Sequence, residues 1–302
     1  MKALSLLPLL ASALLGAAYA QTAPALAAGP TLRVMTYNVR YDEPTDPFVW
    51  DKRREPLAAL VNTTDPDILG VQEVLSHQVT DLAGALPGYA YVGQGRGPDN
   101  PRLRYAKKSG EWNPIFYKTS RLELQESGTF WLSDTPQTPG SFGPQFSLPR
   151  IATWAKFRTL PEGREILAVN THFPHNDGAA DQRAYAARVL LREIDALRGS
   201  RPVVLTGDFN LDIADPAEAA PAALLQGALS DTRAEAPTSA RQGPLNTFFG
   251  FGTAAKDGVR LDYIWTAPKA AFRVTRHRVL DAHQGDYYFS DHLPVVADLI
   301  LR

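Results

Sequence analysis

One short apolar run sets the most specific limit on how this chain folds. Val203 to Thr206 lies between the breakers Pro202 and Gly207, and a run this short suits a buried strand better than a helix. Asp208 and Asn210, a carboxylate and an amide, follow at once. Because ligands of α/β proteins bind beyond the ends of strands, other strands that end in this way would bring their polar groups to the same place.

Seven boundaries between an apolar run and polar residues follow this pattern. They carry Asn38, Gln72-Glu73, Glu111, Asn170-x-His172, Asp208-x-Asn210, Asp262 and Asp291-His292. Taken singly, an Asp or Asn after a strand is usually a turn former or a helix cap, and a lone histidine is usually structural. Seven boundaries that bear only acids, amides and histidines are harder to explain by turn chemistry alone.

The remaining periodicity predicts more strands than helices. Strands are expected at 31–38, 67–72, 89–94, 113–118, 121–131, 151–157, 164–170, 203–206, 261–266, 272–279 and 295–301, and helices at 50–61, 77–86, 179–197 and 216–225. Asp51 is the expected cap of the first helix. Direct hairpins alternate with helical crossovers, which indicates a layered α/β fold with sheets packed together and helices outside.

Composition bounds the class of protein. The 302 residues are 44% hydrophobic, which is enough for a sizeable core, and the formal net charge is −1, so no overall basic field points to nucleic acid. There are no cysteines, which excludes disulfides, thiol nucleophiles and thiolate zinc sites.

The N-terminal twenty residues have the pattern of a secretory signal peptide. Lys2 is followed by an apolar run, Leu4 to Ala18, and by Ala18-Tyr19-Ala20, a small-x-small cleavage site. The alternative is a buried or membrane-anchoring helix, for which the run is short. We expect a signal peptide at 1–20, a flexible lead at 21–30 and a single domain at 31–302. The protein would then be secreted or periplasmic, with no stable membrane span after cleavage.

The polar groups suit the hydrolysis of a phosphate ester. Glu73 is a hard oxygen ligand of the kind that Mg²⁺ or Mn²⁺ prefers, and Asn38 is placed to hold its carboxylate. Asp208 and Asn210 suit the orientation of an attacking water, and a histidine paired with a carboxylate would carry positive charge opposite the phosphate. The residues alone leave open which acid pairs with which histidine.

From about Arg33 to Leu301 the chain resembles the endonuclease/exonuclease/phosphatase superfamily. The resemblance rests on the ordered motifs Thr36-Tyr37-Asn38, Gln72-Glu73, Asn170-Thr171-His172, Gly207-Asp208-Phe209-Asn210, Leu261-Asp262-Tyr263-Ile264 and Ser290-Asp291-His292-Leu293-Pro294. It implies a four-layer α/β sandwich of two packed mixed sheets flanked by helices, and a Mg²⁺- or Mn²⁺-dependent hydrolase.

The resemblance also implies roles for individual residues. Metal ligands would be Glu73 and Asp291. Catalytic residues would be Asp208, which activates water, His292 held by Asp262, and His172 oriented by Glu111. Phosphate contacts would come from Asn38, Asn210, Arg150 and His175. Arg183 would point into the site if His175 does, and the alternative is that His175 is a solvent-facing loop residue.

Substrate identity depends on loops. The connector 95–112 holds Arg96, Arg102, Arg104, Lys107 and Lys108, either a solvated face or a loop that meets an anionic substrate. Trp112, Trp131 and Phe142, in or near the loops 95–112 and 133–149, either stack on a substrate or anchor the packing.

Four functions are compatible with these features. The preferred one is an exported phosphomonoesterase or phosphodiesterase for a modest-sized phosphorylated compound or lipid headgroup. A secreted endo- or exonuclease is the first alternative. A glycosidase using Glu73 and Asp208, and a non-catalytic binding module, are the others.

Overall fold

The computed structural model describes residues 31–97, 110–175, 179–251 and 258–302. The predicted signal peptide and flexible lead, and the basic residues Arg102, Arg104, Lys107 and Lys108, lie outside the described residues. Within the described parts of the chain, no helix combines the length and the apolar character that a membrane crossing requires.

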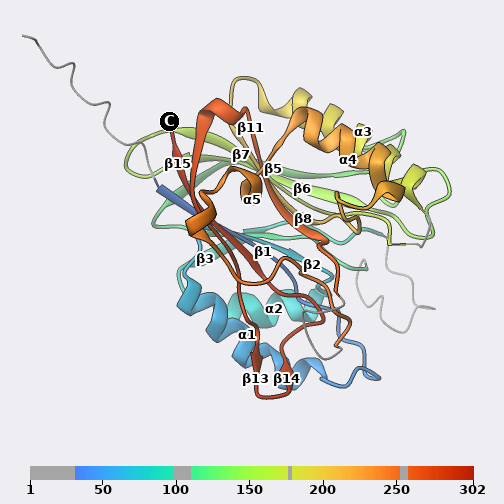
Figure 1. Cartoon of the computed structure of the whole chain (residues 1–302), viewed down its shortest axis with the longest axis vertical. Coiled ribbons are helices and arrows are strands. Elements are labelled where there is room, and N and C mark those ends of the chain that lie inside the picture. Colours follow the sequence, from blue (N-terminus) through green and yellow to red (C-terminus); the bar gives the residue numbers. More distant parts are fainter. Residues whose placement is uncertain (1–30, 98–109, 176–178, 252–257) are drawn as a thin grey trace, which may run out of the picture.

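Two mixed β-sheets form the centre of the molecule (Figure 1). The seven-stranded sheet has the order β10 (Arg241–Gln242), β12 (Phe272–Val279), β15 (Val295–Leu301), β1 (Thr31–Asn38), β2 (Ile68–Gln72), β4 (Ile115–Lys118) and β3 (Tyr89–Val92). The six-stranded sheet has the order β5 (Leu122–Trp131), β6 (Ile151–Thr159), β7 (Glu165–His172), β8 (Val203–Asp208), β11 (Asp262–Ala267) and β9 (Ser230–Asp231). A small hairpin joins β13 (His283–Gln284) to β14 (Tyr287–Tyr288).

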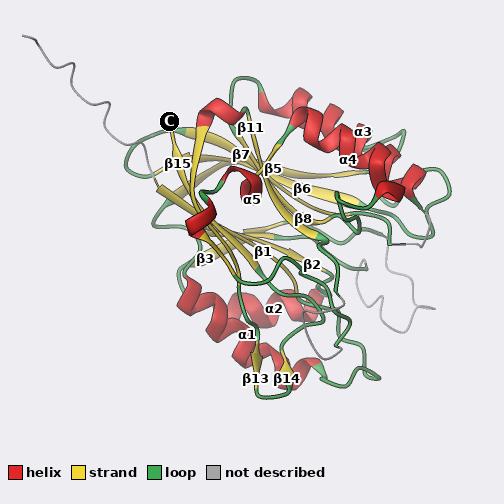
Figure 2. Ribbon diagram, viewed as in Figure 1, coloured by secondary structure: helices red, strands yellow, loops and turns green. Residues whose placement is uncertain are grey.

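Helices cover the outer face of each sheet, as Figure 2 shows. The helices α1 (Trp50–Thr64) and α2 (Ser76–Ala85) pack on the seven-stranded sheet, and α3 (Ala180–Arg198) and α4 (Ala219–Ala228) lie over the six-stranded sheet. Short segments complete the chain: α5 (Thr232–Glu235) and 3-10 turns at Pro216–Glu218, Thr238–Ala240 and Lys269–Ala271. The predicted four-layer α/β sandwich is confirmed.

The start of α1 differs from the prediction. The N-cap residue is Val49, whose backbone is extended, and Asp51 lies in the first turn with a side chain that is 85% exposed. Asp51 therefore does not cap the helix. A carboxylate in the first turn is still favourable because it faces the positive end of the helix dipole.

A buried polar seam fixes one sheet against the other beneath the strand ends. Gln72 of β2 donates through Nε2 to Oδ1 of Asn170 in β7 (2.6 Å), and Asn170 donates to the Val71 carbonyl (2.8 Å). Thr206 of β8 also donates to Asn170 Oδ1 (3.0 Å). At Gly70 any side chain would collide with Thr206 and Asn170, so a glycine is required at this close approach. These buried hydrogen bonds set the relative position of the strands that carry the polar ends.

Candidate active site

Strand register brings three of the predicted residues side by side. In the six-stranded sheet, Asp208 at the end of β8 lies opposite His172 of the parallel strand β7 and opposite Asp262 of the antiparallel strand β11. In the other sheet, Asn38 at the end of β1 lies beside Gln72 at the end of β2. The two sets of strand ends face one cleft, which explains why polar groups recur at these boundaries.

Asn38 is the central hydrogen-bond donor of the cleft. Its Nδ2 donates to Glu73 Oε1 (3.0 Å) and to Asp208 Oδ2 (2.9 Å), and lies 3.4 Å from Nε2 of His292. The amide is oriented by the backbone N–H of Arg40, which donates to Asn38 Oδ1 (3.0 Å). The side chain of Asn38 is fully buried. It therefore links residues from both sheets at fixed spacing.

His292 and Asp262 form a buried ion pair. Nδ1 of His292 lies 2.8 Å from Asp262 Oδ2, and neither residue exposes more than 3% of its surface. Burial alone would lower the pKa of His292, but the charges of Asp262 and Asp208 and the hydrogen bond to Asp262 raise it to about 10. The ring is thus an imidazolium at neutral pH, with Nδ1–H donated to Asp262 and Nε2–H turned toward Asp208.

Asp208 is a buried carboxylate that is suited to take a proton. Burial raises its pKa to about 6, although the charge of His292 and hydrogen bonds from Asn38 and Asn210 oppose the rise. Its Oδ1 accepts the backbone N–H of Asn210 (2.9 Å). A general base works best when its pKa lies near the working pH, and Asp208 meets that condition.

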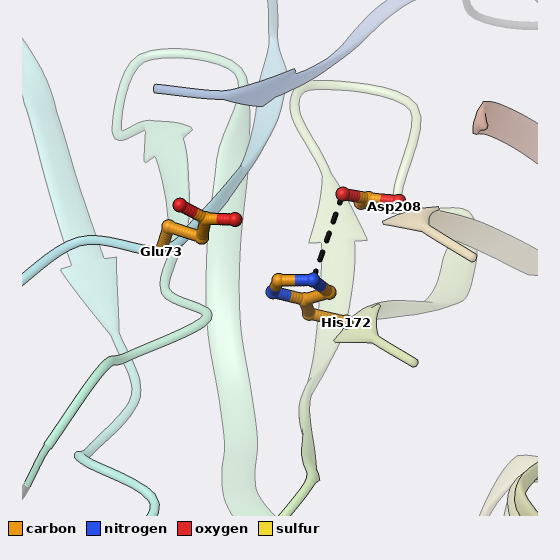
Figure 3. Close-up of side chains that lie close together, drawn as sticks. All are labelled: Glu73, His172 and Asp208. Atoms are coloured by element: carbon orange, nitrogen blue, oxygen red, sulfur yellow. Dashed lines mark ion pairs between the residues drawn. The ribbon is translucent and has the colours of Figure 1, made fainter. Parts of the chain in front are cut away.

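His172 is a neutral histidine, and Glu111 is not its hydrogen-bond partner as predicted. Its Nε2 accepts a hydrogen bond from Asn210 Nδ2 (2.8 Å), so the proton lies on Nδ1. Burial and the charges of Arg150 and Arg96 hold the pKa of His172 well below its usual range. Nδ1 is buried and finds no hydrogen-bond partner among the described residues. In Figure 3 the ring edge that carries Nδ1 is turned toward Glu73.

Glu111 is engaged elsewhere. Both of its carboxylate oxygens accept hydrogen bonds from the guanidinium of Arg96, at 2.7 and 2.9 Å. The backbone N–H of Arg96 also donates to the Glu111 carbonyl (3.0 Å), which sets the two side chains next to each other. Glu111 thus lines the cleft as half of an ion pair and does not orient His172.

A carboxylate-rich corner of the cleft fits a divalent cation. Glu73, His172 and Asp208 each offer one ligand atom, and these atoms lie within 4.8 Å of one another (Figure 3). Oε2 of Glu73 also accepts the backbone N–H of Tyr41 (3.3 Å). Oxygen-rich donor sets suit Mg²⁺ and Mn²⁺.

A second cluster, Asp208, Asp262 and His292, has similar spacing but does not suit a metal. Its imidazole is protonated and its carboxylates are already paired with that ring. Asp291 lines the cleft beside His292 but belongs to neither cluster, and its Oδ1 accepts from Ser290 Oγ (3.3 Å). A role for Asp291 as a metal ligand stays a prediction.

Arg150 offers a charged donor to the cleft. It precedes β6, is 4% exposed, and lies with Nη2 2.7 Å from Nδ1 of His175. Burial and the nearby charge of Arg96 lower the pKa of Arg150 to about 10, so it remains charged at neutral pH. Its Nη1 is buried without a hydrogen-bond partner among the described residues. A buried cation with unused donors in an open cleft suits an anion such as phosphate.

His175 and Arg183 line the same cleft, but they act differently. Burial and the Arg150 charge lower the pKa of His175, so the neutral ring accepts a hydrogen bond from Arg150 and is no free loop residue. Arg183 donates through Nε to Glu218 (2.8 Å) in a buried ion pair. Arg183 therefore does not reach toward the substrate as expected. It helps to form the side of the cleft through its ion pair with Glu218.

The cleft has a volume of about 1300 Å³ and two kinds of wall. Besides Arg183, three arginines line it: Arg40, whose Nη1 lies 4.0 Å from Glu73 Oε2, Arg96, which pairs with Glu111, and Arg150. The wall formed by the segment after β8 is acidic, with Asp212, Asp215 and Glu218. Apolar side chains at the cleft include Phe142, which is 55% exposed, Phe248, whose ring lies 4.8 Å from that of His292, and Val259.

Three residues at the cleft have left-handed backbones. Arg40, Glu73 and Asn210 have φ values of 57°, 65° and 49°. Non-glycine residues rarely adopt this conformation, and it concentrates at functional sites where the surrounding structure holds it in place. Arg40 and Phe248 were not among the predicted site residues, and Arg96 was named only as part of a connector that either is a solvated face or meets an anionic substrate. Arg40 had a usable signal, since it follows Asn38 by two positions.

Known proteins place this chain in a family. The model of the endonuclease/exonuclease/phosphatase family matches residues 35–292. The chain belongs to this family. Members of the family hydrolyse phosphoesters, and the superfamily resemblance of the sequence is confirmed.

Solved structures of the family support the assignment along most of the chain. A family protein from Bacteroides vulgatus is 34% identical, with a TM-score of 0.80 over 90% of this chain and 100% of that one. A mannosyl-6-phosphatase from Bacteroides thetaiotaomicron is also 34% identical, with a TM-score of 0.76 over 89% of this chain and 100% of that one. Nocturnin of Drosophila melanogaster is 28% identical over 57% of this chain, which spans 26% of Nocturnin's own length.

Proposed function

We propose that this protein is an exported, Mg²⁺- or Mn²⁺-dependent phosphatase that releases phosphate from a small compound whose remainder is uncharged, such as a sugar phosphate. The observation that carries the proposal is the division of charge in the cleft. Arg40 and Arg150 lie close enough to Glu73 for its negative charge to stabilise their positive charges, whereas Asp212 and Asp215, which follow β8, line another part of the cleft. A single phosphate fits the first region, and a chain of phosphates would meet carboxylates in the second.

The described residues supply the parts of a hydrolytic reaction. Arg150 binds the phosphoryl oxygens, Asn38 orients Glu73 and Asp208 beside them, and the imidazolium of His292 lies where negative charge grows as the ester breaks. Asp208 accepts the proton of the attacking water. A new phosphorus–oxygen bond forms to that water as the ester bond breaks, and the leaving oxygen takes up a proton to give the alcohol.

A divalent cation would complete this set. Glu73 would hold it, with Asp208 and the neutral His172 nearby, and the cation would polarise a phosphoryl oxygen and neutralise charge on the phosphate. Coordination by His172 would require Nε2 to release the hydrogen bond from Asn210, so Glu73 is the ligand that needs no rearrangement. The choice between Mg²⁺ and Mn²⁺ follows from oxygen donors and is a proposal.

Similarity to the mannosyl-6-phosphatase supports a sugar phosphate as the substrate class, because the chain matches that protein along its whole length. Export rests on the signal-peptide pattern of residues 1–20. A nuclease is the second candidate, and the basic residues of 98–109 favour it, since nucleic-acid binding depends on lysine and arginine contacts to phosphates.

Phosphate release will separate the two candidates. Purified protein would be assayed with Mg²⁺ and with Mn²⁺ on mannose 6-phosphate, glucose 6-phosphate, glycerol phosphate and inositol phosphates, and on plasmid DNA, single-stranded DNA and RNA. Asp208→Ala protein, prepared identically, reports contaminating activity. We expect the sugar phosphates to be hydrolysed fastest. Cleavage of nucleic acid at rates far above those for every small ester would refute the phosphatase proposal.

A further inference from the structure

A buried arginine outside the cleft, Arg53, has no acidic hydrogen-bond partner among the described residues. Arg53 of α1 is 0% exposed, and its ring neighbour is Trp50, 5.4 Å from the guanidinium carbon. All five of its N–H groups meet backbone carbonyls. Nε donates to Phe48 (2.6 Å), Nη1 to Val39 (2.6 Å) and Phe289 (2.9 Å), and Nη2 to Arg40 (3.2 Å) and Tyr41 (3.4 Å).

The first group of carbonyls belongs to residues 39–41, directly after β1. The N–H of Arg40 orients the Asn38 amide, and the N–H of Tyr41 donates to Glu73. Both residues reach these positions through a tight turn in which Arg40 has a positive φ. The guanidinium of Arg53 binds the carbonyls on this turn and so holds it in place.

Phe289 provides the carbonyl on the other side. It precedes Ser290, whose Oγ donates to the Asn38 carbonyl (2.7 Å), and the chain then continues into Asp291 and His292. Nη1 of Arg53 bridges the Val39 and Phe289 carbonyls. Val39 and Phe289 are 250 positions apart in the sequence (289 − 39). One nitrogen thus joins the segment that follows Asn38 to the segment that leads to His292.

We propose that Arg53 is a positioning residue of the active site, whose guanidinium holds residues 39–41 and 289–292 at the spacing that Asn38 and His292 need. The proposal rests on the phosphatase function. Only arginine supplies five donors in a rigid planar fork, whereas a lysine ammonium has three donors on a single nitrogen. A lysine in this place keeps the charge but leaves at least two of the five carbonyls unbound.

A positioning role and a merely structural role differ in what they change. Loss of packing lowers the temperature of unfolding and leaves turnover intact wherever the protein is folded. Loss of positioning lowers kcat in the folded protein, because Asn38 orients Asp208 and His292 acts on the phosphoryl group in the transition state. KM for the ester changes less, because the hydrogen bonds of Arg53 do not reach Arg150, which precedes β6.

The test compares Arg53→Lys with Leu190→Ala, a core substitution in α3 that destabilises the protein away from the cleft. Both are assayed at a temperature where they are folded. We expect Arg53→Lys to lose kcat on the order of 10–100-fold, the scale of a misplaced catalytic group, with KM within about three-fold of wild type. Amide hydrogen exchange should accelerate in 39–41 and 289–292 and stay unchanged in α3.

Two results would overturn the proposal: wild-type kcat in folded Arg53→Lys, or a loss that Leu190→Ala reproduces at equal stability. Should Arg53→Lys not fold, ¹⁵N NMR of the wild-type protein decides. A clamped guanidinium shows separate, slowly rotating Nη1 and Nη2 groups, and a freely rotating one refutes the clamp. Absence of phosphoester hydrolysis by wild type would refute the phosphatase function instead, while exchange and NMR would still report on Arg53.

Discussion

Asp208 Oδ2 lies 3.6 Å from Nε2 of His292, and the same oxygen accepts the hydrogen bond from Asn38. The proposed base, Asp208, and the imidazolium of His292 are therefore direct neighbours. Each charge stabilises the other: His292 opposes the rise in the pKa of Asp208 to about 6, and Asp208 helps to raise the pKa of His292 to about 10. Between those values Asp208 is an anion and His292 a cation.

Asp208→Asn removes the proton acceptor and leaves the shape of the cleft. We expect kcat to fall on the order of 10²–10⁴-fold, the usual contribution of a general base, with little change in the temperature of unfolding. Steady-state kinetics on a sugar phosphate and thermal unfolding check this. Asp195→Asn, an exposed acid on α3, is the control and should match wild type. An active Asp208→Asn enzyme would remove Asp208 from the role of base.

Activity should have a bell-shaped pH dependence. Asp208 must lose its proton to act as a base, so kcat/KM should rise as pH increases through about 6. His292 must keep its proton, so kcat/KM should fall as pH increases through about 10. Return to pH 8 after each measurement distinguishes titration from denaturation.

Asp262→Asn should move both limbs of the profile to lower pH, because the charge of Asp262 raises the pKa of His292 and also that of Asp208. Among the groups that raise the pKa of His292, Asp262 contributes most, so its loss shifts that pKa down toward the ordinary value of 6.5. The alkaline limb should therefore appear at lower pH than in the wild-type enzyme. The control is Asp298→Asn, since Asp298 is a carboxylate of β15 that pairs with Arg33 of β1. An unmoved alkaline limb in Asp262→Asn would show that His292 is not the titrating acid.

Strand ends were the part of the site that sequence could predict. A buried strand has to stop where its residues become polar, and paired strands stop at the same edge. For this reason Asp208, Asp262 and His172 were found from separate stretches and lie opposite one another in the sheet. The layered fold followed from the same boundaries, since apolar runs between breakers give strands whatever their partners are.

Side-chain pairing was the part that sequence could not predict. Glu111 was predicted to orient His172, yet its carboxylate binds Arg96. These two residues are 15 positions apart, and their pairing depends on how the chain folds back between them. Arg53 gave no signal either, since a charged residue in a helix normally faces solvent. Its burial depends on carbonyls from turns that are far apart in sequence.

Metal dependence is expected from the Glu73 corner. Chelation with EDTA should abolish hydrolysis, and Mg²⁺ or Mn²⁺ should restore it. Glu73→Gln removes the negative charge but leaves a side chain of the same length beside Asn38 and Tyr41. The metal concentration required for half-maximal activity should therefore rise by about ten-fold or more. Titration of Mn²⁺ into protein without substrate, followed by calorimetry, gives the same comparison independently of turnover. Equal affinity in both proteins would exclude Glu73 as the principal ligand.

Arg150 should control the affinity for the phosphate group. Its Nη2 is used by His175, and its Nη1 has no partner among the described residues, so a bound phosphate would satisfy it. Hydrogen bonds to charged groups contribute about 1.5–3 kcal/mol, which corresponds to a rise in KM of roughly 10–100-fold in Arg150→Met. Inhibition by inorganic phosphate should weaken by the same factor, because both ligands present the same oxygens.

Lys156→Met is the matched control for that change. Lys156 lies on β6, the strand that Arg150 precedes, but its ammonium pairs with Glu126 (2.7 Å) rather than lining the cleft. Loss of positive charge from this strand should therefore leave KM and phosphate inhibition unchanged. A long-range effect of charge would raise KM in both variants alike, whereas direct binding raises it in Arg150→Met alone. Equal KM in Arg150→Met and wild type would show that the buried guanidinium serves His175 and not the substrate.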